Sequence, residues 1–154
     1  PVTEAITGLD LVEWQLRVAR GETLPLRQDQ VKLTGHAIEV RLYAEDAYNG
    51  FLPQTGRIDR WQPASGVGVR TDHGMTDGLA ISPFYDPMIA KVIVHADTRE
   101  AAIDRLIEAL SAFEIQGLKN NIPAVLTILR SPQFRDGAVH TGLIPEVMTK
   151  KKTT

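Results

Sequence analysis

A glutamate and an arginine two positions apart, in a stretch of alternating side chains, are the strongest candidates for chemistry in this chain. In the run Gly35-His-Ala-Ile-Glu-Val-Arg-Leu-Tyr-Ala-Glu-Asp46, Glu39 and Arg41 fall on one face of an expected strand. A guanidinium offers a planar fork of N–H donors that matches carboxylate or phosphate oxygens. If this face borders a cleft, Arg41 can hold an anion or stabilise developing negative charge. On an open surface the same pair would be an ion pair of little energetic value, so both interpretations stay open here.

Other arrangements that carry chemistry are not present in the sequence. Ser65-Gly-Val-Gly-Val-Arg70 has two glycines but does not complete G-x-G-x-x-G, and it precedes a strand-like run, whereas that fingerprint opens a helix. No Walker lysine pattern and no nucleophile elbow occur. The four histidines show no i, i+4 pair and no H-E-x-x-H, so the sequence predicts no metal site.

The elements around Glu39 and Arg41 are predicted from hydrophobic periodicity. Apolar residues at helical spacing predict a first helix over residues 9–20, capped by Thr7 and ended by Gly21. Alternation with a period of two predicts a set of strands over residues 31–96, including a well-buried one at 88–95.

Helical spacing returns after the last of these strands. A helix is expected to begin after Asp97, which can cap it. A further helix is expected over 121–130, with a proline in its first turn. The order helix, strands, helices predicts an α+β fold, with a mixed or antiparallel sheet, rather than alternating βαβ units.

Composition limits the classes of function. The 154 residues are 43% hydrophobic and 23% charged, which suits one domain with a real core. The net charge of −2 gives no general attraction to nucleic acid, and no apolar run is long enough to predict a membrane span. There are no cysteines, so disulfides and thiolate chemistry are excluded, which fits a reducing compartment. We therefore expect a cytoplasmic location, or the mitochondrial matrix if the protein is eukaryotic.

Three stretches together resemble the C-terminal part of biotin carboxylases, the ATP-dependent components of acyl-CoA carboxylases. They are the strand motif 35–46, the opening Pro1-Val-Thr-Glu4 with the apolar run that follows, and Tyr85-Asp-Pro-Met-Ile-Ala-Lys91. The resemblance extends to about residue 144. It implies that residues 1–30 are the closing helix of an ATP-grasp domain, that 31–145 form the biotin carboxylase C-terminal domain, and that 146–154 are a flexible basic tail.

The resemblance also implies an activity. Biotin carboxylases carboxylate carrier-bound biotin with bicarbonate and ATP, and Arg41 matches the arginine that lies beside the biotin ureido ring and stabilises its anion. The implied cofactors are ATP, Mg²⁺ and biotin. The implied partners are a biotin carboxyl carrier protein or domain and a carboxyltransferase subunit. In the family, a catalytic Gln-Val-Glu-His segment, the phosphate-binding parts and the magnesium ligands all precede the Pro-Val-Thr-Glu run, so we expect this chain alone to be inactive.

Two further residue roles follow from the resemblance, each with a plainer alternative. Arg70 stands where bacterial biotin carboxylases make their homodimer contact, and Val67 occupies a place often filled there by an aromatic residue. Arg70 can equally be a solvated residue at a strand end. Leu143, in His140-Thr-Gly-Leu-Ile144, matches a segment that closes over adenine, but can equally be part of the core.

Two other functions stay open at this stage. One is the biotin carboxylase domain of a pyruvate carboxylase, although Pro1 stands where that group often has threonine. The other is a non-catalytic module for folding and dimerisation.

Overall fold

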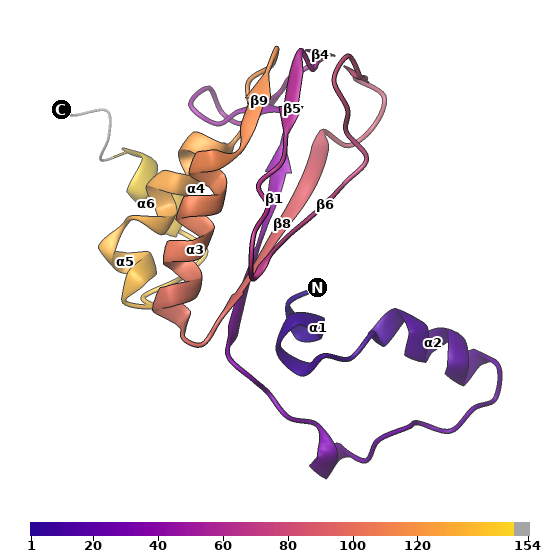
Figure 1. Ribbon diagram of the computed structural model, residues 1–154. Helices are drawn as coiled ribbons and strands as arrows, with labels where there is room; N and C mark the ends of the chain where they lie inside the picture. Colours follow the sequence, from indigo (N-terminus) through magenta and orange to yellow (C-terminus); the bar gives the residue numbers. More distant parts are fainter. Residues whose placement is uncertain (150–154) are drawn as a thin grey trace.

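The computed structural model, which describes residues 1–149, is built on an antiparallel sheet of three strands (Figure 1). The strands lie in the order β1 (His36–Tyr43), β8 (Met88–Ala96) and β6 (Val69–His73). Helix α3 (Arg99–Ala112) packs across all three strands, and α4 (Ile122–Leu129) packs on α3. This architecture confirms the expected α+β fold.

Alternation along each strand explains why one face of this sheet is apolar. Leu42 on β1 and Val92 and Val94 on β8 point to α3 and are completely buried. They meet Ile103 and Leu106, which recur on one side of α3 at helical spacing. The same period of two sends the intervening side chains of each strand to the opposite face of the sheet.

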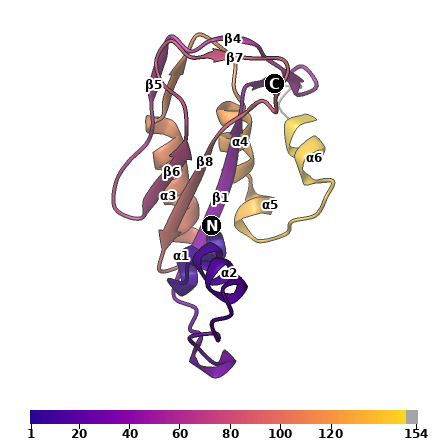
Figure 2. The same ribbon diagram turned by 90° about the vertical axis from the view of Figure 1, so that its right-hand side faces the viewer.

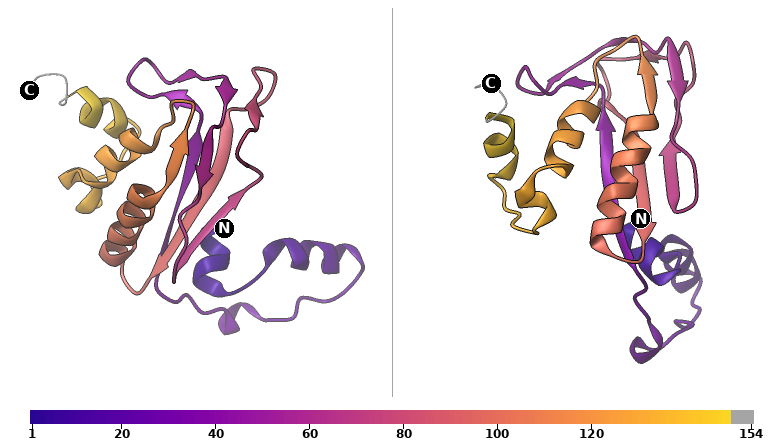
Figure 3. Two further views of the ribbon diagram at one scale, coloured as in Figure 1. Left: turned by 45° about the horizontal axis from the view of Figure 1, so that its top comes forward. Right: turned by 60° about the vertical axis from the view of Figure 1, so that its left-hand side comes forward.

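The N-terminal segment lies on that opposite face (Figure 3). Helix α1 (Val2–Thr7) contacts β1 and β8, and α2 (Leu11–Ala19) projects away from the sheet with no buried residue, followed by the short helix η1 (Gln28–Gln30). The helix expected over 9–20 is α2. Helix α1 before it was not predicted, and Gly8, in a left-handed conformation (φ 72°), ends α1 and separates the two helices.

The capping residues of two helices also differ from those predicted. Thr7 ends α1, and Asp10 caps α2 by accepting a hydrogen bond of 2.9 Å from the Glu13 N–H. Thr98 rather than Asp97 caps α3, accepting from the Ala101 N–H at 3.2 Å. In each case the capping oxygen lies three residues before the amide that it accepts from, which is the usual geometry.

Short paired strands extend from one end of the central sheet, at the top of Figure 2. All of the pairs are antiparallel, and they are β2 (Glu45–Asp46) with β3 (Leu52–Pro53), β4 (Gly56–Arg57) with β7 (Ala80–Ile81), and β5 (Arg60–Gln62) with β9 (Glu114–Gln116). Within the region 31–96, where a set of strands was expected, Arg57 and Trp61 thus belong to two short strands with different partners. The partner β9 was not predicted.

Two short helices follow α4 at the C-terminal end of the described chain. They are α5 (Pro132–Arg135) and α6 (Leu143–Thr149). Residues 146–149, expected to begin a flexible tail, instead continue α6, because Val147 is buried against the rest of the protein. The remainder of the expected tail, 150–154, lies outside the described residues.

Candidate functional site

The side of the sheet opposite α3 carries a group of charged residues that we call the charged face. It consists of Glu39 and Arg41 on β1, Lys91 on β8, and Arg70 and Asp72 on β6. Strand register places Lys91 directly opposite Arg41 on one side and Asp72 on the other. Two cations directly opposite each other repel, so an anion bound at Arg41 and Lys91 would be favoured.

Arg41 leaves most of its donors free on this face. Its side chain is 59% exposed, and its Nε lies 3.7 Å from Glu39 Oε1, a long ion pair. A hydrogen bond with the Tyr43 side chain is the main cause that raises the pKa of Arg41 above its usual value. The guanidinium is therefore always cationic and is only lightly held by its own chain.

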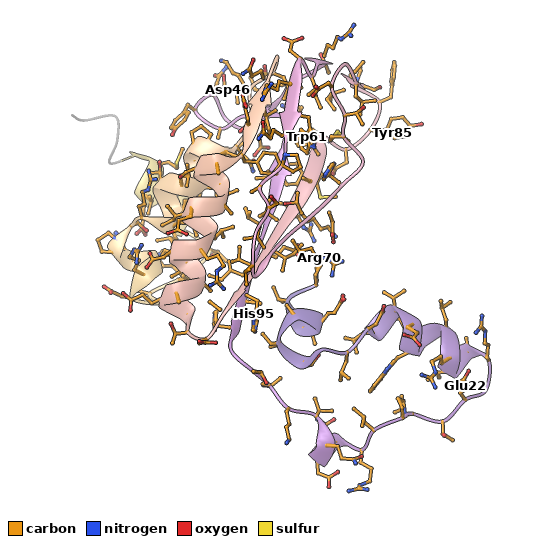
Figure 4. The ribbon with its side chains drawn as sticks, viewed as in Figure 1. Glu22, Asp46, Trp61, Arg70, Tyr85 and His95 are labelled. Carbon is orange, nitrogen blue, oxygen red and sulfur yellow. The ribbon has the colours of Figure 1, made fainter. Side chains whose placement is uncertain are left out.

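Arg70 is held much more firmly. Its Nε and Nη2 donate to the two Asp72 carboxylate oxygens at 2.7 and 2.8 Å, and its Nη1 lies 3.2 Å from Glu4 Oε1 on α1. The hydrogen bond from Arg70 is the main cause that lowers the pKa of Asp72. In Figure 4, Arg70 and His95 lie at the end of the sheet next to α1. There they line a cavity of about 360 Å³ between α1 and the sheet.

The other two residues predicted from the resemblance lie away from Arg41. Val67 is 93% exposed in the turn before β6, where nothing else in the described chain covers it. Leu143 is 5% exposed at the start of α6, a helix that packs on α4. The burial of Leu143 suits a packing role. Its contact with adenine stays a prediction, as does the dimer contact at Arg70 and Val67.

The sequence analysis did not identify Asn121, which holds the backbone of β1 next to Arg41. Asn121, at the start of α4, is 7% exposed, and its side chain bonds to the backbone of β1 on both sides of Leu42. It donates to the Arg41 carbonyl oxygen at 3.1 Å and accepts from the Tyr43 N–H at 3.0 Å. The only signal in the sequence was an asparagine before an expected helix, which says nothing about a contact 80 positions away.

Residues 1–149 contain neither a cluster of metal ligands nor a membrane-spanning helix. No three histidine, aspartate or glutamate side chains gather closely enough to hold a metal ion. None of the helices in this part of the chain has the length and apolar character needed to span a bilayer.

Comparison with protein families gives two adjacent matches. Residues 39–146 match the biotin carboxylase C-terminal domain, and residues 1–27 match the ATP-binding domain of the carbamoyl-phosphate synthase L chain. The fold and these matches define an α+β domain of the carboxylase type. Because the first match covers more than half of the sequence, the chain belongs to the biotin carboxylase C-terminal domain family.

Individual relatives agree with this assignment. Biotin carboxylase from Halalkalibacterium halodurans is 50% identical over 144 residues, which are 94% of this chain and 32% of the relative. The propionyl-CoA carboxylase alpha chain of Caenorhabditis briggsae is 48% identical over 149 residues, 96% of this chain and 20% of the relative. The chain thus spans a third or less of the length of these relatives.

Solved structures show the same fold. The biotin carboxylase domain of 2-oxoglutarate carboxylase from Hydrogenobacter thermophilus superposes with a TM-score of 0.93 at 43% identity, covering 96% of this chain and 33% of that one. That structure is a domain dimer with MgADP, ADP and bicarbonate. A pyruvate carboxylase from Rhizobium etli matches with a TM-score of 0.92 at 35% identity, covering 96% of this chain and 16% of that one.

Proposed function

We propose that this chain is the C-terminal part of the biotin carboxylase component of an acyl-CoA carboxylase. The complete enzyme would carboxylate carrier-bound biotin with bicarbonate, driven by ATP cleavage. Family membership and relatives such as propionyl-CoA carboxylase support this proposal. The chain spans only part of those relatives, and by itself we expect it to be inactive.

The observation that carries the proposal is the exposed guanidinium of Arg41, which has donors that no neighbouring residue uses. Biotin becomes nucleophilic when a ureido nitrogen loses its proton, and the negative charge then spreads onto the ureido oxygen. A fixed cation with unused N–H donors stabilises such a charge more than it stabilises the neutral ring. Arg41 can supply such donors, since it is 59% exposed, its ion pair with Glu39 is long at 3.7 Å, and its hydrogen bond with Tyr43 leaves other N–H groups unused. We assign Arg41 the role of holding the ureido oxygen as its charge develops, on the side of the site that also receives bicarbonate.

The N-terminal helices support a division into two domains, with residues 1–30 closing an ATP-grasp domain and 31–145 forming the C-terminal domain. Helix α2 has no buried residue and leaves large apolar side chains exposed, including Leu11, Val12 and Leu16. Together with the match of residues 1–27 to an ATP-binding domain, this suggests that α2 packs against the remainder of that domain.

The cofactors and partners of the complete enzyme belong to the same proposal. The phosphates of ATP and the Mg²⁺ ions would be held by parts of the enzyme other than residues 1–149, in which no metal-binding cluster occurs, while Leu143 would contact the adenine. A biotin carboxyl carrier protein or domain would bring biotin to Arg41, and a carboxyltransferase subunit would receive the product. We further propose a homodimer contact through Arg70 and Val67. The location would be cytoplasmic in a bacterium, or the mitochondrial matrix in a eukaryote; the Caenorhabditis briggsae alpha chain is named as mitochondrial.

The test separates bicarbonate activation from biotin carboxylation. In the full-length subunit that carries this sequence, Arg41→Ala should lower carboxylation of free biotin by about a hundredfold, as expected on removing one donor to a transition-state charge. Bicarbonate-dependent ATP cleavage without biotin should persist, because that step does not involve the ureido ring. Normal biotin carboxylation by the variant would contradict the assigned role and favour a non-catalytic module.

A further inference from the structure

Strand β1 lies at the edge of the three-stranded sheet, and part of its open edge is occupied by Asn121. The Asn121 side chain donates to the Arg41 carbonyl at 3.1 Å and accepts from the Tyr43 N–H at 3.0 Å. Its backbone N–H donates to the Tyr43 carbonyl at 3.2 Å. One residue therefore supplies the bonds that a neighbouring strand would otherwise make to this stretch.

Strand β1 needs the hydrogen bonds from Asn121 because its pairing with β8 is irregular directly after Arg41. Its pairing with β8 is regular from His36 to Leu42, but the register shifts between Leu42 and Tyr43. Such a bulge interrupts the ladder and leaves the bulged strand free to bend and twist, which re-aims nearby side chains. Pairing with β8 therefore cannot by itself hold the backbone directly after Arg41, and Asn121 binds both sides of the shift.

Asn121 is itself firmly placed. It is 7% exposed, the Val125 N–H donates to its carbonyl at 3.0 Å, and the next residue, Ile122, belongs to the hydrophobic core. Its side chain also bonds to Glu45, whose pKa is raised by burial and lowered to a smaller extent by this contact. The amide thus connects a buried helix start to the strand segment that carries Arg41.

We infer that Asn121 is a positioning residue for Arg41, which fixes the backbone at residues 41–43 so that the guanidinium is held where charge develops. This inference rests on the role of Arg41 proposed above. Catalytic groups need placement within about half an ångström, and small displacements cost up to about two orders of magnitude in rate. Asn121 touches no reacting atom in this account and acts through Arg41 alone.

A double-mutant cycle in the full-length subunit tests this inference. Asn121→Ala should lower kcat for free biotin carboxylation by about tenfold or more, with bicarbonate-dependent ATP cleavage unchanged. In an Arg41→Ala background the same substitution should cause little further loss, because a positioning residue has nothing left to position. A merely structural role would instead lower both reactions together.

Asn120 supplies a matched control. Its side chain accepts from the Ile122 N–H at 3.1 Å, so Asn120→Ala disturbs the same helix start without touching β1, and it should leave kcat for biotin nearly unchanged. If Asn121→Ala folds poorly, Asn121→Asp takes its place. It keeps the acceptor for the Tyr43 N–H, loses the donor to the Arg41 carbonyl and to Glu45, and places a carboxylate beside Glu45.

The outcomes are distinguishable. Normal biotin carboxylation by Asn121→Ala, or an equal loss with and without the Arg41 guanidinium, would overturn the inference while leaving the role of Arg41 intact. Normal carboxylation by Arg41→Ala alone would overturn the proposed function first, and the inference with it.

Discussion

Arg70 and Asp72, two residues apart on β6, form a two-point contact in which Nε and Nη2 donate to separate carboxylate oxygens at 2.7 and 2.8 Å. Arg41, on the same face of the sheet, has only a 3.7 Å contact with Glu39 among the ion pairs of the described chain. The difference divides the two arginines by role. Arg70 joins strand β6 to helix α1 through Asp72 and Glu4, whereas Arg41 keeps N–H donors that a bound anion can use.

This difference predicts that replacing Arg70 lowers stability more than replacing Arg41 does. Arg41→Ala should leave the free energy of unfolding nearly unchanged, because the side chain is exposed and its ion pair with Glu39 is long. Arg70→Ala should lower it by roughly 0.5–1 kcal/mol, since it removes contacts to Asp72 and to Glu4 on α1 and half of the side chain is screened by water. Urea unfolding of the two variants measures both changes. A larger loss for Arg41→Ala would mean that Arg41 is structural.

Asp72 predicts a dependence of stability on pH. Its folded pKa is lowered, mainly by the hydrogen bond from Arg70, so the folded chain binds this proton less tightly than the unfolded chain. The resulting stabilisation is present above the unfolded pKa of about 3.9 and is lost as the pH falls through the lower folded value. The stability gap between the wild type and Asp72→Asn should therefore shrink in acid. A gap that stays constant between pH 7 and pH 2 would contradict this.

Truncation of the buried side chain of Leu106 should lower stability strongly. It is completely buried between α3 and the sheet, so Leu106→Ala should lower the free energy of unfolding by about 3 kcal/mol through lost burial and a cavity. Leu33 is an exposed leucine in the connector before β1, and Leu33→Ala should change it by less than about 0.5 kcal/mol. Equal midpoints in urea for the two variants would show that the core lies elsewhere.

Gly137 and Gly117 both have left-handed backbone conformations, so their substitution by alanine can be compared directly. At Gly137 (φ 76°) no atom lies within 4 Å of an added Cβ, so Gly137→Ala should cost only the backbone strain of about 1 kcal/mol. At Gly117 (φ 100°) the added carbon would collide with the Arg57 carbonyl and lie 2.8 Å from the Asp59 nitrogen, so Gly117→Ala should cost clearly more. Thermal unfolding ranks the two. A smaller loss at Gly117 would disprove the close approach of Gly117 to the backbone at Arg57 and Asp59.

Much of the central domain was predictable because its signals are local. The buried strand expected at 88–95 is β8, and the helix expected at 121–130 is α4. Both have continuous apolar patterns whose period identifies the element. The sequence was less informative where a pattern was short, as for β9, whose three residues form a strand only by pairing with β5.

In the candidate site, too, some features were predictable from the local sequence and others were not. Alternation along β1 by itself determined that Glu39 and Arg41 share the face opposite the buried Leu42, because successive side chains of any strand point to opposite sides. The family motif pointed to Arg41 among the other charges. Tertiary structure alone decided that Arg70 joins β6 to Glu4 on α1, whereas Arg41 forms no ion pair beyond its own strand in the described residues, and that Asn121 braces the strand from 80 positions away. Such contacts exist only after the chain has closed on itself, so no local spacing in the sequence encodes them.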